Sequence, residues 1–130
     1  MIGILGAYSG IYLYVVGAAT LAGFGVPLLV APLTWGRWFR WDVQQATPLT
    51  VFLGRSVGMF LCVLGVYAFR VSGVPAAQPF FFELLLWILV GMLALHIYGA
   101  IVRAQPWTET VEIALWVILI LATLVFYPTG

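Results

Sequence analysis

The sequence predicts an all-α integral membrane protein, a four-helix bundle with an interfacial segment between the first and second helices. Of its 130 residues, 65% are hydrophobic and only 7% are charged, whereas about a quarter of the residues are charged in soluble domains. Apolar runs long enough to cross a ~30 Å hydrocarbon core recur along the chain. Short segments that contain proline and glycine separate them. This composition excludes a water-soluble globule.

The first predicted span covers residues 4–28. It lies within a run of 35 residues, from 2 to 36, that has no charged side chain. A straight helix of that length would measure ~52 Å, which is too long for one crossing. We therefore expect the glycines and prolines between residues 23 and 32 to break the helix. Gly6 and Gly10 form a GxxxG pattern, which predicts the close approach of another helix backbone.

Residues 32–48 form the predicted interfacial segment, because tryptophans alternate with arginines along it. Indole rings favour the headgroup level of a membrane, and arginine at that level can reach lipid phosphates. The predicted membrane-interface anchors are Trp35, Arg37, Trp38, Arg40, Trp41 and, before the fourth helix, Trp107. We interpret them as an aromatic belt that sets the depth of the chain, with recognition of anionic lipid or of a partner as the alternative.

The second predicted span covers residues 49–70. Three of its glycines lie at offsets of four and eleven residues and therefore share one helix face, which predicts a seam between helices: Gly54, Gly58 and Gly65. Cys62, the single cysteine, lies in the same apolar run and predicts packing rather than redox chemistry. Arg55 lies about two turns inside the span, where a charge needs a partner or must extend to the surface.

The stretch LGRSVGMFLCVLG, residues 53–65, resembles the arginine and glycine pattern of a helix in small four-helix bacterial inner-membrane proteins of the DoxX-like kind. In that family the pattern lies on the first helix, whereas here it lies on the second. The resemblance implies a membrane architecture and no particular activity. A chain without lysine but with five arginines also indicates a bacterial coding bias.

The third and fourth predicted spans cover residues 79–102 and 109–127. Glu83 lies near the start of the third span and His96 near its end, and their separation of thirteen residues places them at different depths. Between the spans, residues 103–110 predict a tight turn, with Thr108 as the N-cap of the fourth helix.

Three ionisable side chains lie at a similar depth in this topology, and we expect Arg55, His96 and Glu112 to form a cluster. We interpret this cluster as a structural ion pair that joins three helices, with a proton-coupled or anion site as the alternative. Arg70 and Glu83 flank one short loop, and we expect them to form a structural ion pair.

His96 is the only histidine, and as an axial ligand it is also a candidate for binding haem or pigment. The spacing of histidine, cysteine and acidic residues indicates no metal cluster, and no hydrolase, phosphate-loop or thiol-pair motif occurs. We therefore expect a protein that is not an enzyme. The small net charge of +1 leaves no basic patch for nucleic acid.

The arginines favour one orientation. Arg37, Arg40, Arg55 and Arg103 belong to the first and third connections, and the positive-inside rule places these in the cytoplasm with both termini outside. We expect a structural or accessory subunit of a larger complex in the bacterial inner membrane, in contact with lipid and with other membrane subunits. The alternatives are an autonomous carrier or binder of a quinone or lipid, and a pigment- or haem-binding subunit of an energy-converting complex.

Overall fold

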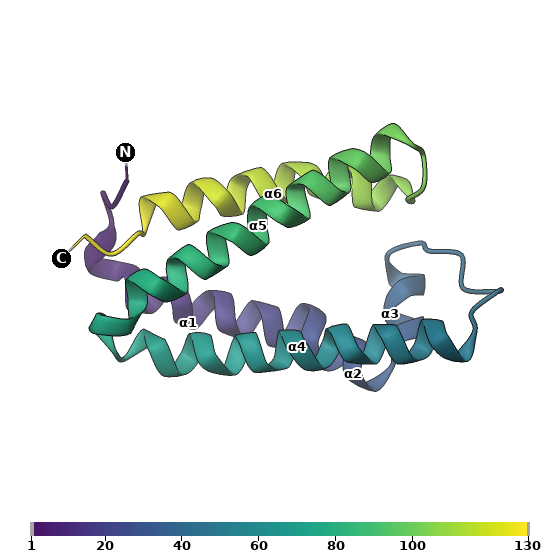
Figure 1. The fold of residues 1–130 in the computed structure, drawn as a ribbon, viewed down its shortest axis with the longest axis horizontal. Coiled ribbons are helices and arrows are strands. Elements are labelled where there is room, and N and C mark those ends of the chain that lie inside the picture. The colour runs from purple at the N-terminus through teal and green to yellow at the C-terminus, as the bar shows by residue number, and fades with distance from the viewer. Residues whose placement is uncertain (1, 130) are drawn as a thin grey trace. The chain divides into compact units, whose positions relative to one another are not determined.

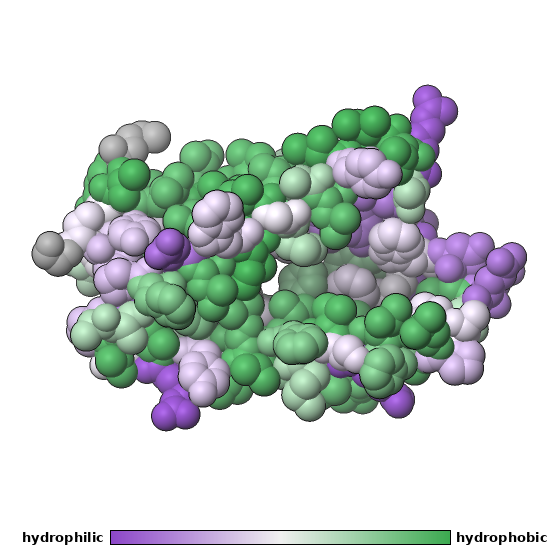
Figure 2. Space-filling view, viewed as in Figure 1, coloured by the Kyte–Doolittle hydropathy of each residue, from purple (hydrophilic) through white to green (hydrophobic). Residues whose placement is uncertain are grey.

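The computed structural model describes residues 2–129 and is all-α (Figure 1). Four helical segments are long and apolar enough to cross a membrane: Gly6–Val30, Pro48–Ser72, Pro75–Ile101 and Trp107–Val125. The predicted class, all-α with four long apolar helices, is therefore confirmed. Large apolar side chains are exposed on all four segments, and hydrophobic residues cover most of the face in Figure 2, as expected for contact with lipid.

The chain divides into two compact units, one formed by Met1–Tyr12 and Val71–Gly130 and the other by Leu13–Arg70. The predicted single transmembrane domain stays a prediction. The interfacial placement of residues 32–48 also stays a prediction, since no membrane is present in the structure.

The first apolar segment continues through its glycines instead of ending at them. It begins with a 3₁₀ turn, η1 (Gly6–Tyr8), and continues as α1 (Ser9–Thr20), a π-helical turn η2 (Leu21–Gly25) and α2 (Val26–Val30). An α-helix would direct the carbonyl of Gly23 to the N–H of residue 27, but this residue is proline and has none. The indole Nε1 of Trp35 donates to this carbonyl at 2.9 Å instead.

The expected break therefore comes later than the end predicted for the span at residue 28. Ala31 leaves helical geometry at φ −140° and ψ 65°, and Pro32 begins the short helix α3 (Pro32–Trp38). Steric contact with a following proline disfavours the helical conformation, which explains why the helix ends at this residue. By contrast, Pro27 lies in the first turn of α2, where a proline is tolerated.

The predicted glycine seam of α4 (Pro48–Ser72) is confirmed. An added Cβ at Gly65 would lie 3.1 Å from the carbonyl oxygen of Gly17, and one at Gly58 would collide with the backbone of Leu28 and Leu29. At Gly54 it would meet the ring of Pro32 at 2.6 Å. Small residues let helix backbones approach closely, and packing of this kind associates helices in lipid.

We expect Gly58→Ala to lower the free energy of unfolding of the detergent-solubilised protein by about 1–3 kcal/mol, because the new methyl group overpacks a backbone contact. Thermal unfolding followed by circular dichroism measures the change. Gly91→Ala is the matched control, since Gly91 is a mid-helix glycine with no atom within 4 Å of the added Cβ. Equal melting temperatures for the two variants would contradict the seam.

Buried polar contacts organise the other unit near the start of α5 (Gln78–Ile101). Gln78 is 5% exposed and follows the 3₁₀ turn η3 (Pro75–Ala77). Its Nε2 donates to the carbonyl of Ser72 at 3.0 Å, and its Oε1 accepts from the hydroxyl of Ser9 at 2.5 Å. This amide therefore joins the start of α1 to the last residue of α4. Gly10 permits the approach predicted from the GxxxG pattern, since an added Cβ would lie 2.6 Å from the Ser72 oxygen.

The helices α5 and α6 (Trp107–Val125) lie side by side and run in opposite directions (Figure 1). The buried residues of α6 recur every seven positions, at Glu109, Trp116 and Thr123, a spacing typical of closely packed helix pairs. Thr123 donates to the Leu119 carbonyl at 2.7 Å. Its oxygen therefore accepts the hydroxyl proton of Tyr12 at 2.6 Å, which fixes the start of α1 against this pair.

The start of α6 differs from the expectation. The N-cap is Pro106 and not Thr108, so the helix begins at Trp107. The fixed φ of proline and its lack of an N–H suit the position before a first turn, which makes a side-chain cap unnecessary. This earlier start places Glu109 in the first turn of the helix.

Candidate functional site

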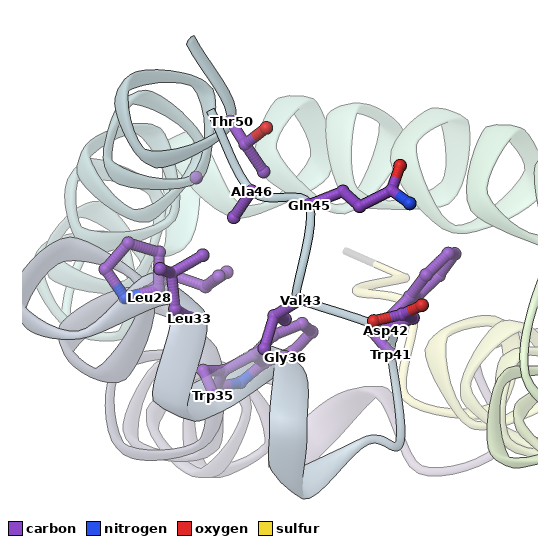
Figure 3. A pocket seen from close by; sticks show the side chains of 12 residues that line it. Leu28, Leu33, Trp35, Gly36, Trp41, Asp42, Val43, Gln45, Ala46 and Thr50 are labelled. Atoms are coloured by element: carbon purple, nitrogen blue, oxygen red, sulfur yellow. The ribbon is translucent and has the colours of Figure 1, made fainter. Parts of the chain in front are cut away.

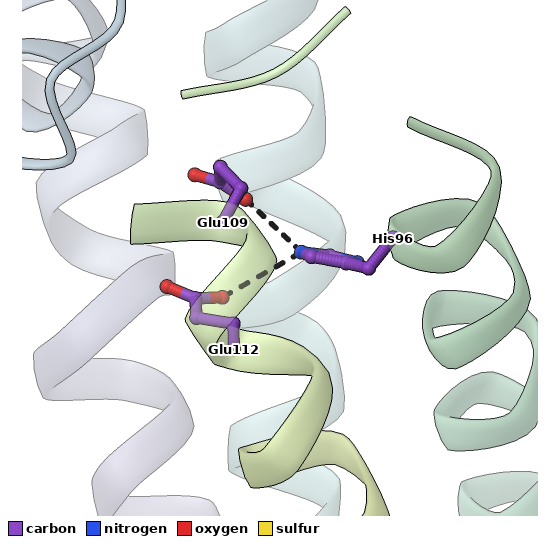
Figure 4. A group of neighbouring side chains, drawn as sticks. All are labelled: His96, Glu109 and Glu112. Carbon is purple, nitrogen blue, oxygen red and sulfur yellow. Dashed lines mark hydrogen bonds and ion pairs between the residues drawn. The ribbon is translucent and has the colours of Figure 1, made fainter. Parts of the chain in front are cut away.

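One histidine and two glutamates meet near the α5–α6 turn (Figure 4). His96 projects from α5 toward the first two turns of α6, where Glu109 and Glu112 are three residues apart and share a face. The imidazole Nε2 lies 3.0 Å from Oε2 of Glu109 and 3.6 Å from Oε2 of Glu112. His96 and Glu109 are buried, and the side chain of Glu112 is only 13% exposed.

The other ring nitrogen of His96 fixes the protonation pattern. Its Nδ1 lies 2.8 Å from the carbonyl oxygen of Met92, one helical turn earlier. A carbonyl only accepts hydrogen bonds, so Nδ1 must carry the hydrogen of this bond. In a neutral imidazole, Nε2 is then a bare acceptor that faces two carboxylates. The contact with Glu109 therefore requires an imidazolium, a protonated carboxyl group or a bound cation between the two atoms.

The turn after α5 gives this cluster its geometry. Arg103 adopts φ 54°, while the Arg103 N–H bonds to Ala100 O at 3.3 Å and the Ala104 N–H bonds to Gly99 O at 2.9 Å. These two bonds form a Schellman motif, which normally has glycine at the left-handed position. Gln105 Nε2 then donates to the carbonyl of His96 at 3.1 Å. The side chain of Gln105 lies over Gly99, where an added Cβ would collide with it.

A tryptophan from α6 shields the imidazole. The ring of Trp116 lies 5.2 Å from that of His96, at an interplanar angle of 51°. Trp116 is buried, and its Nε1 has no hydrogen-bond acceptor among the described residues. This ring limits the access of water to the cluster from the side of the helix core, which strengthens electrostatic interactions there.

The structure brings together two of the three residues of the predicted cluster, His96 and Glu112, and adds Glu109. Sequence reasoning missed Glu109 because it placed this residue at the edge of the helix. The available signal was the three-residue spacing of two acids on one face. Arg55 is exposed on α4 and belongs to the unit Leu13–Arg70, so its membership of the cluster stays a prediction.

The two members of the predicted Arg70–Glu83 pair also belong to different units, and the pair stays a prediction. The guanidinium carbon of Arg70 lies 5.6 Å from the centre of the Tyr67 ring, in a cation–π contact. Glu83 is exposed on α5.

The absence of a metal cluster, expected from sequence spacing, needs revision in one respect. His96, Glu109 and Glu112 each offer a ligand atom, and these atoms lie within 4.8 Å of one another. His96 and Glu109 are thirteen residues apart and belong to no short ligand motif of one helix. The turn between α5 and α6 makes them neighbours. Axial ligation of haem or pigment by His96 stays a prediction; in the structure both ring nitrogens face oxygen atoms.

The predicted interface anchors lie on α3, on the chain that follows it and at the start of α6. Trp38 and Trp107 are 67% and 64% exposed, and Arg37 and Arg40 are also exposed, as anchoring at a membrane surface requires. Trp35 instead packs internally, since its ring stacks on that of Phe39 at 4.5 Å. The role of these residues at the membrane surface stays a prediction.

An open pocket of about 340 Å³ lies beside α3 and the start of α4 (Figure 3). Its lining is mainly apolar, with a few polar groups from the connection after α3 and from α4. The lining residues are Leu28, Pro32, Leu33, Trp35, Gly36, Trp41, Asp42, Val43, Gln45, Ala46, Thr50 and Gly54.

The fold and hydropathy define a class, that of multi-pass membrane proteins. No protein-family model, curated protein or solved structure matches this chain. The resemblance of residues 53–65 to the DoxX-like kind therefore stays a prediction.

We expect Arg103→Gly to raise the free energy of unfolding by about 1 kcal/mol, because glycine removes the penalty of a left-handed conformation. Arg103→Ala is the control, since it removes the charge but retains the strained backbone. Chemical denaturation of both variants in detergent measures the difference. Equal stabilities for the glycine and alanine variants would contradict the assigned backbone conformation.

Proposed function

We propose that the protein is a non-catalytic accessory subunit of a larger complex in the bacterial inner membrane. The observation that carries this proposal is a pair of charged side chains exposed on the faces of apolar helices, Arg55 on α4 and Glu83 on α5. A charged group at membrane depth is costly and usually faces protein or a wet cavity. A neighbouring subunit would supply such surroundings.

Glu83 gives the clearer case of the two. It lies five residues after the start of α5, or ~7.5 Å along the helix. Phe80 and Trp87 lie on the same face and are 75% and 71% exposed, while Phe82 and Leu85 are buried on another face. An acidic group between two exposed aromatic rings fits a partner helix that offers arginine or lysine, because aromatic and ion-pair contacts then combine.

Arg55 lies seven residues after Pro48, or ~10.5 Å into α4. Its long side chain can extend along the helix to the headgroup level, which lowers the cost of its position. It therefore supports the proposal less strongly than the shorter Glu83. The distribution of arginines supports the cytoplasmic placement of the first and third connections, with both termini outside.

Native mass spectrometry of the protein, extracted from its source membrane in mild detergent, tests this role. We expect a particle much heavier than the 14.3 kDa chain, containing other membrane subunits. We expect Glu83→Gln to release most of the chain from this particle, because its charge partner would stay buried and unpaired. Glu83→Asp, which retains the charge, should remain largely associated.

A bare monomer or small homo-oligomer would contradict the accessory role. An added mass of a quinone or lipid on that particle would favour the carrier alternative, and the pocket beside α3 would then be the first place to search. A visible absorption band that disappears in His96→Ala would favour the pigment or haem alternative.

A further inference from the structure

We propose that His96, Glu109 and Glu112 bind a divalent transition-metal ion of the zinc type. The site would use Nε2 of the imidazole and one oxygen of each carboxylate. This inference concerns the α5–α6 pair alone and does not depend on the accessory role.

The distances between the donor atoms fit one small ion. Zinc binds histidine nitrogen and carboxylate oxygen at about 2.0–2.2 Å, so two neighbouring ligands of a tetrahedral ion lie about 3.3 Å apart. Nε2 lies 3.0 Å from the Glu109 oxygen and 3.6 Å from the Glu112 oxygen, on either side of this value. The whole set fits within 4.8 Å. Coordination of one ion by all three atoms therefore needs the two carboxylate oxygens to lie about 3.3 Å apart as well, which rotation of the glutamate side chains allows.

The imidazole is also oriented as a ligand. Metal-binding histidines commonly donate their other N–H to a carbonyl or carboxylate, which fixes the tautomer that coordinates the ion. The bond from Nδ1 to Met92 O, at 2.8 Å, has this effect and directs the Nε2 lone pair toward the two acids. The hydrogen bond from Gln105 to the His96 carbonyl holds the same turn of α5 in place.

The charge of the site points the same way. A neutral imidazole and two ionised carboxylates sum to a charge of −2, which a divalent ion neutralises. The 3.6 Å distance from Glu112 to Nε2 is too long for a direct hydrogen bond, although this carboxylate is mostly buried. Coordination would satisfy both carboxylates at once, whereas a single proton on Nε2 makes one short contact and one long one.

The donor types indicate the class of metal. One imidazole and two carboxylates suit zinc and neighbouring divalent ions, while magnesium and calcium prefer oxygen ligands alone and copper(I) prefers sulfur. Three protein ligands leave a fourth position for water or another ligand, as in zinc sites that exchange ligands. Because Glu109 lies in the first turn of α6, the site lies at an end of the helix pair and not at its middle.

Cobalt(II) and zinc are the probes for the test, with the full chain purified in detergent and treated with a chelator. We expect one Co²⁺ per chain in equilibrium dialysis, visible absorption bands from the bound Co²⁺, and loss of these bands on addition of zinc. Glu109→Gln and Glu112→Gln should each weaken binding at least about tenfold. Asp42→Asn, which neutralises an exposed acid outside the four apolar segments, should leave binding unchanged.

The glutamine variants keep the size of the side chain and retain polar atoms, and circular dichroism checks that they remain helical. The wild type gives a second readout that needs no substitution, because its single histidine yields one set of imidazole nitrogen resonances. Zinc should shift the Nε2 resonance and leave Nδ1 protonated. The absence of stoichiometric binding to the wild type, or equal binding by all variants, would overturn the proposal.

Discussion

The α5–α6 pair depends on one constraint, which is that a proton or a cation must lie between Nε2 of a buried imidazole and two carboxylates. The bond from His96 to the Met92 carbonyl leaves only Nε2 to face Glu109 and Glu112. Such a cluster is stable in an apolar environment only when its geometry compensates for lost hydration. The turn, the Gln105 contact and the shielding ring of Trp116 all serve this geometry.

In the unit Leu13–Arg70, the helices are held by close contacts between their backbones and not by a buried cluster of polar side chains. Gly17 faces Gly65, and Gly58 faces the chain at Leu28, so the first segment and α4 approach as closely as backbones allow. Pro27 has no N–H to bond to the carbonyl of Gly23, and the indole of Trp35 donates to this carbonyl instead. Trp35 is thus part of the helix architecture as well as a candidate anchor.

Hydropathy and glycine spacing predicted the four long helices and the seam of α4 correctly, because both depend on local pattern. The sequence did not reveal that a π-helical turn precedes Pro27 and lets the helix continue through this residue. The indole of Trp35, eight residues after Pro27, donates to the carbonyl that lacks a helical partner. Sequence reasoning also missed Glu109, because the predicted helix began at this residue, whereas α6 begins at Trp107 and contains Glu109 within its first turn. The sequence analysis also did not identify Gln78, whose amide joins two helix ends. Contacts between distant residues decided each of these cases.

The position of the hydrogen on the His96 ring decides whether the cluster has this geometry, and nitrogen-15 NMR of histidine-labelled protein measures it without ambiguity, since the chain has one histidine. We expect Nδ1 to carry a hydrogen that is bonded to the Met92 carbonyl, in the wild type and in Glu109→Gln alike. A neutral ring protonated at Nε2, with a bare Nδ1, would contradict this geometry, because such a ring cannot donate to that carbonyl.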